Sequence, residues 1–137
     1  MNLGALMDEI AARAALAPEL SGKTYAGPVG TVVPPAGIVP FPQGIKYNQT
    51  YARGRDAVDG WLVVVVGRPP EPQTRDLATL YTDGAGPSSM VTLFDQPGWV
   101  AADHVDIIEC DFDAWQVGGI DYLAIIFTWR AIGPGNG

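Results

Sequence analysis

The chain has 137 residues, 47% of them hydrophobic and 17% charged, with a formal net charge of −7. This length predicts one domain with its own core and is too short for a cleft between two lobes. The eight Lys and Arg residues are scattered apart from Arg53 and Arg55, which argues against stable nucleic-acid binding, because phosphate recognition needs several converging cations.

Cysteine content and hydropathy argue against export and against a membrane anchor. Cys110 is the only cysteine, which excludes an internal disulfide. Asp8 and Glu9 interrupt the apolar N-terminal residues, unlike the apolar region of a signal peptide. No apolar run approaches the ~18 residues that a transmembrane helix needs. We therefore expect a protein of the cytoplasm, or of a particle assembled there.

The first predicted element is an amphipathic helix over residues 2–17. Its apolar residues recur at the i, i+3, i+4 spacing of one helix face. Asn2 can cap the first turn, and Pro18 should end the helix because it disfavours α geometry at the residue before it. A short edge strand is expected at residues 23–26.

Residues 27–44 are rich in proline and glycine. Their five prolines make a central strand implausible, although Ile38 and Val39 can pair at a sheet edge. We expect an ordered extended segment or loop on the surface. Residues 45–52 alternate loosely and are predicted to pair with the following strand through a turn at residues 53–56.

An uninterrupted apolar run at residues 61–66 predicts a strand that is buried on both faces and central in the sheet. Two short helices should follow. Thr74 is the predicted cap of the first, with Leu77, Leu80 and Tyr81 on its inner stripe. Either Ser88 or Ser89 should cap the second, whose apolar residues are Met90, Val91, Leu93 and Phe94.

The remaining residues predict a long β-hairpin around a Gly118-Gly119 turn, because two adjacent glycines suit the positive φ angles of a tight turn. Pairing outward from this turn sets Val117 opposite Ile120, Trp115 opposite Tyr122, Ala114 opposite Leu123, Phe112 opposite Ile125, Cys110 opposite Phe127 and Ile108 opposite Trp129.

This register separates the residues of the hairpin into two faces. The predicted core face holds Ile108, Cys110, Phe112, Ala114, Leu123, Ile125, Phe127 and Trp129. The other face carries Glu109, Asp111 and Asp113 and becomes apolar at the tip, with Trp115, Val117, Ile120 and Tyr122. Aromatic side chains at the end of an arm indicate a contact with another protein.

The order of elements favours the α+β class, with an antiparallel or mixed sheet, helices packed on one face and a long C-terminal hairpin. We expect a single domain over residues 1–132 and a flexible tail over residues 133–137.

The sequence offers little for catalysis, and we expect no enzyme, no cofactor and no metal site. His104 is the only histidine, and no serine or cysteine is placed as a nucleophile beside it. Asp106, Glu109, Asp111 and Asp113 form an acidic row that could hold a hard cation. A solvated strand face that resists aggregation is the simpler interpretation, and the row could also complement a basic partner.

Several weak motifs in one order resemble the tail terminator, or tail completion, proteins of long-tailed phages that infect actinobacteria. The series starts with the N-terminal helix and continues through Val33 to Pro40 and through Tyr47 to Arg55. It then has a strand that ends Val66-Gly-Arg68 and a helix that opens Arg75-Asp-Leu77. The final members are Tyr81 to Pro87 and the hairpin through Val117 to Ala124.

The resemblance implies a non-enzymatic structural protein of the virion, assembled in the host cytoplasm. Such a protein forms a ring, commonly a hexamer, that caps the completed tube of the major tail tube protein and ends its polymerisation. It also forms the tail side of the junction with the head-tail connector or stopper protein. DNA passes through the ring without stable binding, and no membrane is involved.

A cyclic ring needs two different surfaces on each subunit. The candidate interaction residues from the sequence are Arg53 and Arg55 in the turn, and Trp115, Val117, Ile120 and Tyr122 at the hairpin tip. The alternative functions are another neck, head-completion or minor tail protein and, more remotely, a small metal-dependent hydrolase that uses the acidic row.

Overall fold

Six strands form one mixed sheet in a computed structural model that describes residues 2–27, 30, 32–46, 55–68 and 72–134. The strands are β1 (Thr24–Ala26), β2 (Ala36–Val39), β3 (Gly44–Lys46), β4 (Arg55–Gly67), β5 (His104–Val117) and β6 (Ile120–Pro134). Their order is β1-β2-β4-β6-β5, and β3 pairs with β4 beyond the end of β2. Only β1 and β2 run parallel; the other pairs are antiparallel. The α+β class is confirmed.

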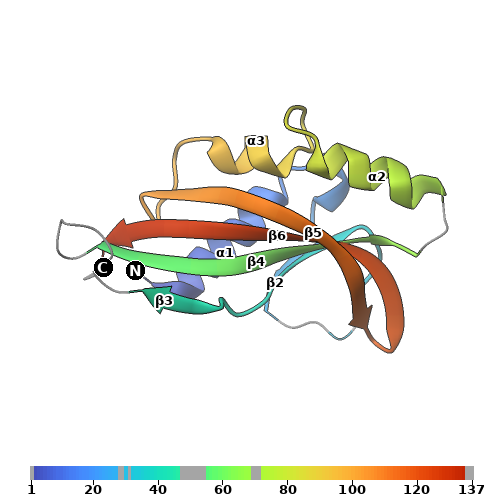
Figure 1. The fold of residues 1–137 in the computed structure, drawn as a ribbon, viewed down its shortest axis with the longest axis horizontal. Coiled ribbons are helices and arrows are strands. Elements are labelled where there is room, and N and C mark those ends of the chain that lie inside the picture. The colour runs from blue at the N-terminus through green and yellow to red at the C-terminus, as the bar shows by residue number, and fades with distance from the viewer. Residues whose placement is uncertain (1, 28–29, 31, 47–54, 69–71, 135–137) are drawn as a thin grey trace.

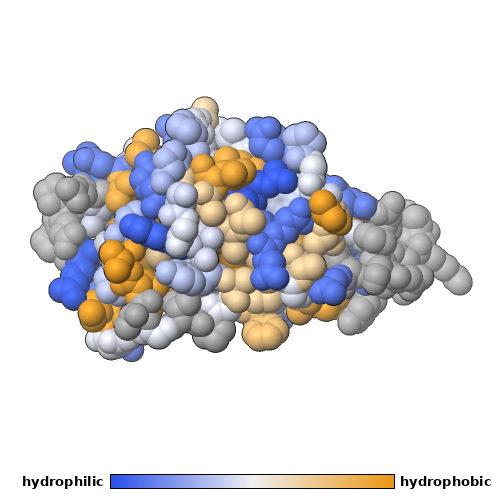
Figure 2. All heavy atoms as spheres, turned by 180° about the vertical axis from the view of Figure 1, so that it is seen from behind, coloured by the Kyte–Doolittle hydropathy of each residue, from blue (hydrophilic) through white to orange (hydrophobic). Residues whose placement is uncertain are grey.

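Three helices pack on one face of this sheet, as Figure 1 shows for α1 behind the strands and for α2 and α3 along one side. They are α1 (Leu3–Ala14), α2 (Pro72–Thr82) and α3 (Met90–Asp95), and a single 3₁₀ turn covers Pro18–Leu20. None of the helices in the described ranges has the length and apolar content needed to cross a bilayer. Figure 2 shows the molecule from behind, where polar residues separate the apolar patches of the described surface.

The helix-covered face of the sheet holds the main core. Alternate residues of β4 and β6 point into it, and the apolar stripe of each helix covers them. The largest fully buried side chains of this core include Leu62, Phe94, Phe127, Trp129 and Tyr81. Gly60 lies directly opposite Trp129 across the β4–β6 ladder, and a Cβ at Gly60 would collide with the Trp129 ring. The missing side chain of Gly60 therefore makes room for the indole.

Two of the predicted helix caps are confirmed. The Asn2 side chain accepts a hydrogen bond from the Ala5 amide, and the Ser89 hydroxyl accepts one from the Thr92 amide. Helix α1 ends at Ala14, earlier than the predicted residue 17, because Pro18 starts a separate 3₁₀ turn.

The start of α2 differs from the prediction. It begins at Pro72, so Thr74 lies inside the helix and its hydroxyl donates to the Arg68 carbonyl oxygen at 3.1 Å. Tyr81 is fully buried, as expected, but Leu80 is 48% exposed and does not belong to the inner stripe.

The sheet assignment of β2 corrects the prediction for the proline-rich segment. β2 lies between β1 and β4 and is buried along its length, so it is not an edge strand. Pro34 and Pro35 precede this strand and Pro40 follows it. The prolines thus flank the four pairing residues, whose own amide groups remain free for the ladder.

The apolar run at residues 61–66 is central, as predicted, and belongs to the longer strand β4 between β6 and the β2–β3 side. β3 pairs antiparallel with residues 57–59 of β4, which supports the predicted pairing of the segment that starts at Ile45. Of the turn predicted at residues 53–56, residues 53 and 54 lie outside the described ones, whereas Arg55 and Asp56 are already paired residues of β4 and not part of a turn.

The hairpin register is confirmed from the turn as far as Cys110 opposite Phe127. Beyond that pair it shifts, so that Ile107 and not Ile108 lies opposite Trp129. Ile108 is the extra residue of a β-bulge and is 57% exposed.

The predicted core face of β5 is therefore only partly a core. Ile125, Phe127 and Trp129 on β6 are buried, but Phe112 is 57% exposed and Ala114 is also exposed. β5 is the last strand of the sheet, and the buried clusters of the helix side include only its Val105, with Ile107 and Cys110 partly buried. The half of β5 nearer the hairpin turn, which includes Phe112 and Ala114, is therefore not buried on this face as the prediction assumed.

The C-terminal boundary also differs from the prediction. β6 continues to Pro134, and Gly133 and Pro134 pair with Asp56 and Arg55 of β4. The first two residues of the predicted flexible tail are thus part of the sheet, and residues 135–137 lie outside the described ones.

Candidate assembly surfaces

Among the described residues, no helix covers the second face of the sheet, which we call the open face. Val63, Val65 and Ala124 are buried on this face near the hairpin tip, whereas Trp61, Arg130 and much of β5 are accessible. The β5 residues of this face are acidic: Asp106, Glu109, Asp111 and Asp113 are all exposed. Their partners on β6 are Arg130, Thr128, Ile126 and Ala124. All four carboxylates of the predicted acidic row thus lie on the open face.

One ion pair crosses the middle of this open face. Arg130 Nε donates to Asp59 Oδ1 at 2.7 Å, and the hydrogen bond and charge of Asp59 raise the pKa of the Arg130 guanidinium. At the start of β5, His104 Nε2 lies 3.6 Å from Asp106 Oδ2, and both side chains are about half exposed. Charges of both signs thus lie near Arg130 on the open face. Toward the hairpin tip, the charged residues of β5 on this face are acidic, ending with Asp113.

The acidic row does not converge on a point. Among the described residues, no group of three or more His, Cys, Asp or Glu side chains is arranged to hold a metal ion. Successive carboxylates follow the strand, where residues two apart are separated by about 6.5 Å. A row of this kind acts on a partner through its electrostatic field.

Two of the four interaction residues predicted at the hairpin tip are buried within the chain. Val117 and Tyr122 are 6% and 7% exposed and belong to a second buried cluster on the open face, with Ile38, Val63 and Val65. The tip curls over the sheet in Figure 1 and covers that end of β2 and β4. Val117 and Tyr122 are thus used inside the chain.

The other predicted interaction residues have mixed outcomes. Ile120 is 36% exposed and Trp115 is half-buried against the tip cluster, so both retain some accessible surface. Arg55 opens β4, where its backbone pairs with Pro134. Arg53 lies outside the described residues.

Some of the exposed apolar side chains lie on or near the two edge strands of the sheet, and others lie on the helices and loops, such as Leu16, Leu80 and Val100. Ile108 and Phe112 lie on β5. On the opposite side, Tyr25 of β1 is 36% exposed, and Val33 and Phe41 beside β2 are each 73% exposed. Exposed residues in apolar groups of this kind are typical of protein contact surfaces.

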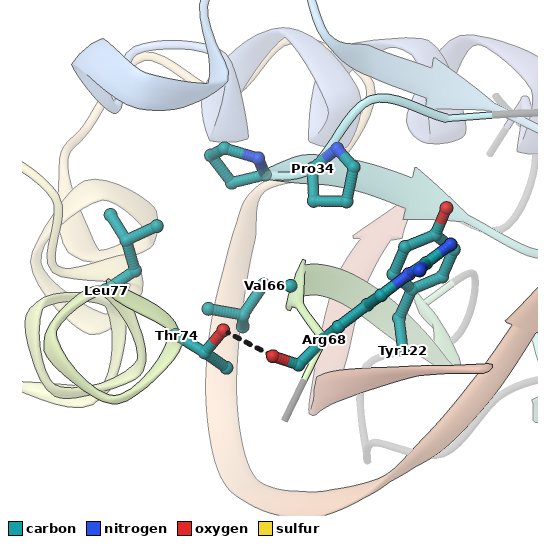
Figure 3. A pocket seen from close by; sticks show the side chains of 8 residues that line it. Pro34, Val66, Arg68, Thr74, Leu77 and Tyr122 are labelled. Atoms are coloured by element: carbon teal, nitrogen blue, oxygen red, sulfur yellow. Dashed lines mark hydrogen bonds between the residues drawn. The ribbon is translucent and has the colours of Figure 1, made fainter. Parts of the chain in front are cut away.

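A hollow of about 290 Å³ lies between the start of α2 and the hairpin, lined by Pro34, Pro35, Val66, Gly67, Arg68, Thr74, Leu77 and Tyr122. Figure 3 shows Leu77 and Thr74 on one side, Tyr122 on the other and Pro34 above. The Thr74 hydroxyl is already bonded to the Arg68 carbonyl oxygen. The hollow contains no pair of groups suited to nucleophilic or acid–base chemistry.

Helix α1 fixes the loop between α3 and β5. Glu9 accepts hydrogen bonds from the Val100 and Ala101 amides, at 2.9 and 2.8 Å. Arg13 donates to the Leu93 and Gln96 carbonyl oxygens, and its guanidinium carbon lies 4.2 Å from the centre of the Trp99 ring. The loop is held in one position, with Val100 90% exposed at its surface.

Comparison with known proteins gives no identification. No protein-family model matches the chain, and no curated protein matches it at a significant level.

Proposed function

We propose that this protein is a structural phage protein that caps the completed tail tube as a ring and forms the tail side of the head-tail junction. The observation that carries the proposal is the ordered resemblance to tail terminator proteins, which extends from the N-terminal helix to the hairpin. A sheet with two different free edges and an acidic open face supports it.

The charge of the open face suits a ring through which DNA passes. Four carboxylates of β5 face solvent there, and Arg130 is already paired with Asp59. A duplex held by cations would stay bound, because each neutralised phosphate adds to the affinity. An acidic lining repels the duplex and so lets it move.

Deletion of the gene in its phage tests the proposal. The expected result is tails of excessive and variable length in electron micrographs, with filled heads that lack attached tails. Expression of the wild-type gene from a plasmid should restore a single tail length. Tails of normal length in the deletion contradict a terminator.

The same deletion separates the second candidate, another neck, head-completion or minor tail protein. A head-closure protein should leave tail length unchanged and yield heads that lose their DNA. The remote candidate, a metal-dependent hydrolase, predicts that calcium or magnesium raises the melting temperature and that Glu109→Ala with Asp111→Ala abolishes the shift.

A further inference from the structure

The sheet has two edges that differ in length, charge and shape. Within the residues that the structure describes, β5 pairs only with β6, and β1 pairs only with β2. Each therefore presents a row of backbone amide and carbonyl groups with no ladder partner on its outer side. Unpaired edges of this kind template strand pairing with another chain.

The β5 edge is long, amphipathic and acidic. Phe112 and Ile108 are each 57% exposed, while Glu109, Asp111 and Asp113 lie on the open face. The strand contains no Lys or Arg. A strand added beside β5 would thus meet carboxylates on the open face and the Phe112 ring on the helix side.

The opposite edge has the complementary character. Residues 21–46 contain two charged side chains, Lys23 and Lys46, and no carboxylate. Tyr25 pairs with Ile38, a member of the buried cluster on the open face. Tyr25 therefore lies on the open face. Lys23 directly precedes β1, and its carbonyl oxygen accepts a hydrogen bond from the Gly37 amide of β2, so the alternation of side chains along the extended chain places Lys23 on the same face.

We propose that β5 of one copy of this chain pairs with the β1 edge of the next copy, so that one sheet continues from subunit to subunit. Lys23 of the second copy then lies on the same face as Glu109 and Asp111 of the first, within reach of a cross-strand ion pair. The inference deepens the proposed ring by naming the two surfaces that meet.

This contact is heterologous: one edge meets a different edge, and repetition closes a ring when the rotation fits. It also puts every helix layer on one side of the assembly and every open face on the other. The acidic rows of successive copies would then line one continuous surface.

The charges disfavour the symmetric alternative. If β5 paired with β5 of a second copy, the carboxylate rows would lie side by side, and like charges on adjacent strands are destabilising. The negative charge of β5 thus acts both as an attraction for the β1 edge and as a barrier to a two-fold dimer.

Charge reversal tests the contact. Asp111→Lys and Lys23→Glu each place like charges across the proposed interface, and the double variant restores opposite charges. Sedimentation velocity across a concentration series, with negative-stain microscopy, measures self-association. Each single variant should weaken it by about tenfold or more, and the double variant should recover most of the loss. Asp113→Lys reverses a second charge on the same edge and should also weaken self-association, which provides a second test if Asp111→Lys does not fold.

Asp76→Lys, on the exposed side of α2, is the control with the same change in net charge as Asp111→Lys. It should associate like the wild type, and circular dichroism should show all variants folded. Wild-type rings that tolerate both reversals would overturn the edge contact and leave the proposed function intact. A wild type that stays monomeric in solution and forms no ring on tail tubes, or a two-fold dimer strengthened by Asp111→Lys, would also overturn it.

Discussion

The two faces of the sheet use alternate residues of the same strands for different purposes. On β4, Leu62 and Val64 point to the helices and are fully buried, whereas Asp59 and Trp61 face the open side, where Trp61 is 37% exposed. β6 repeats the pattern, with buried Trp129 next to the exposed Arg130. Because neighbouring residues serve opposite faces, the stability of the fold and the contacts of the open face can change independently.

The hairpin tip is the exception to this division. There the open face is also buried, because the strands curl back and cover Val63 and Val65 with Tyr122 and Val117. One half of the open face is thus a second small core, and the other half is a polar surface. Substitutions can test where the boundary falls.

The largest expected effect is on the helix-covered face. Trp129 is fully buried among α-helical and strand side chains, so Trp129→Ala should lower the free energy of unfolding by about 3–5 kcal/mol. Urea denaturation followed by circular dichroism measures this loss. A loss below about 1 kcal/mol would mean that the helices do not pack firmly on this face.

The hairpin tip should come next. Tyr122→Ala removes a ring that is 7% exposed at the border of the smaller cluster, and we expect a loss of about 2–3 kcal/mol. Ile120→Ala, at the more exposed partner of Val117, is the matched control and should cost much less. Equal small effects of both substitutions would show that the tip does not fold back in solution.

Gly60→Ala tests the close packing between β4 and β6, because it adds a methyl group where the space is already filled. The new methyl group meets the Trp129 ring, and the resulting shift should cost about 1–3 kcal/mol. Gly44→Ala, where a Cβ meets nothing within 4 Å, is the control in an adjacent strand. A stabilised Gly60→Ala protein would contradict the position of the indole.

The loop held by α1 should respond more weakly. Glu9→Ala removes the acceptor of the Val100 and Ala101 amides and should cost about 1–2 kcal/mol. The control is Asp8→Ala, at an exposed position of the same helix turn. Hydrogen exchange should show faster exchange at these two amides in the Glu9 variant, and unchanged exchange would contradict the contact.

The smallest effect is a change of reactivity on β5. Burial, with the negative charges of Asp111 and Glu109, raises the pKa of the Cys110 thiol above its ordinary value. The reactive thiolate is therefore scarcer at pH 8 than in an unperturbed thiol, and alkylation should be slow in the folded protein. The rate should rise as the pH is raised, and at a fixed pH it should be higher in Asp111→Asn, which removes one of the negative charges. A folded-state rate equal to that in urea would contradict this environment.

The sequence predicted the strands of the central sheet because their residues carry their own signal. The apolar run at 61–66 has no polar position on either face, and the hairpin alternation from Cys110 to Val117 matches its partner strand residue by residue. The Gly118-Gly119 turn has φ angles of 59° and 79°, as such a turn requires.

The bulge was missed although the sequence contains a sign of it. Glu109, Asp111 and Asp113 are spaced by two, but Asp106 and Glu109 are spaced by three. All four lie on one face only if an extra residue is inserted between Asp106 and Glu109, which is the place of Ile108. Two adjacent isoleucines hid the shift, because either one could fill the position opposite Trp129.

The candidate surfaces were harder to predict, because exposure depends on what lies over a strand. Nothing in Phe112 itself distinguishes it from the buried Phe127; Phe112 lies on the edge strand β5, whereas Phe127 lies on the interior strand β6 within the main core. The same holds for Tyr122, whose burial follows from the curl of the hairpin. The local sequence pattern predicts which residues of a strand share a face of the sheet, whereas tertiary packing determines which of these residues are buried.

The most direct test of the central claim is the native mass of the purified wild-type protein, alone and on tail tubes. A tail terminator assembled through its sheet edges predicts a closed species of about six times the 14.5 kDa chain mass, formed in solution or at the tube end. A protein that remains a 14.5 kDa monomer at every concentration, and that does not bind tubes, would contradict the account.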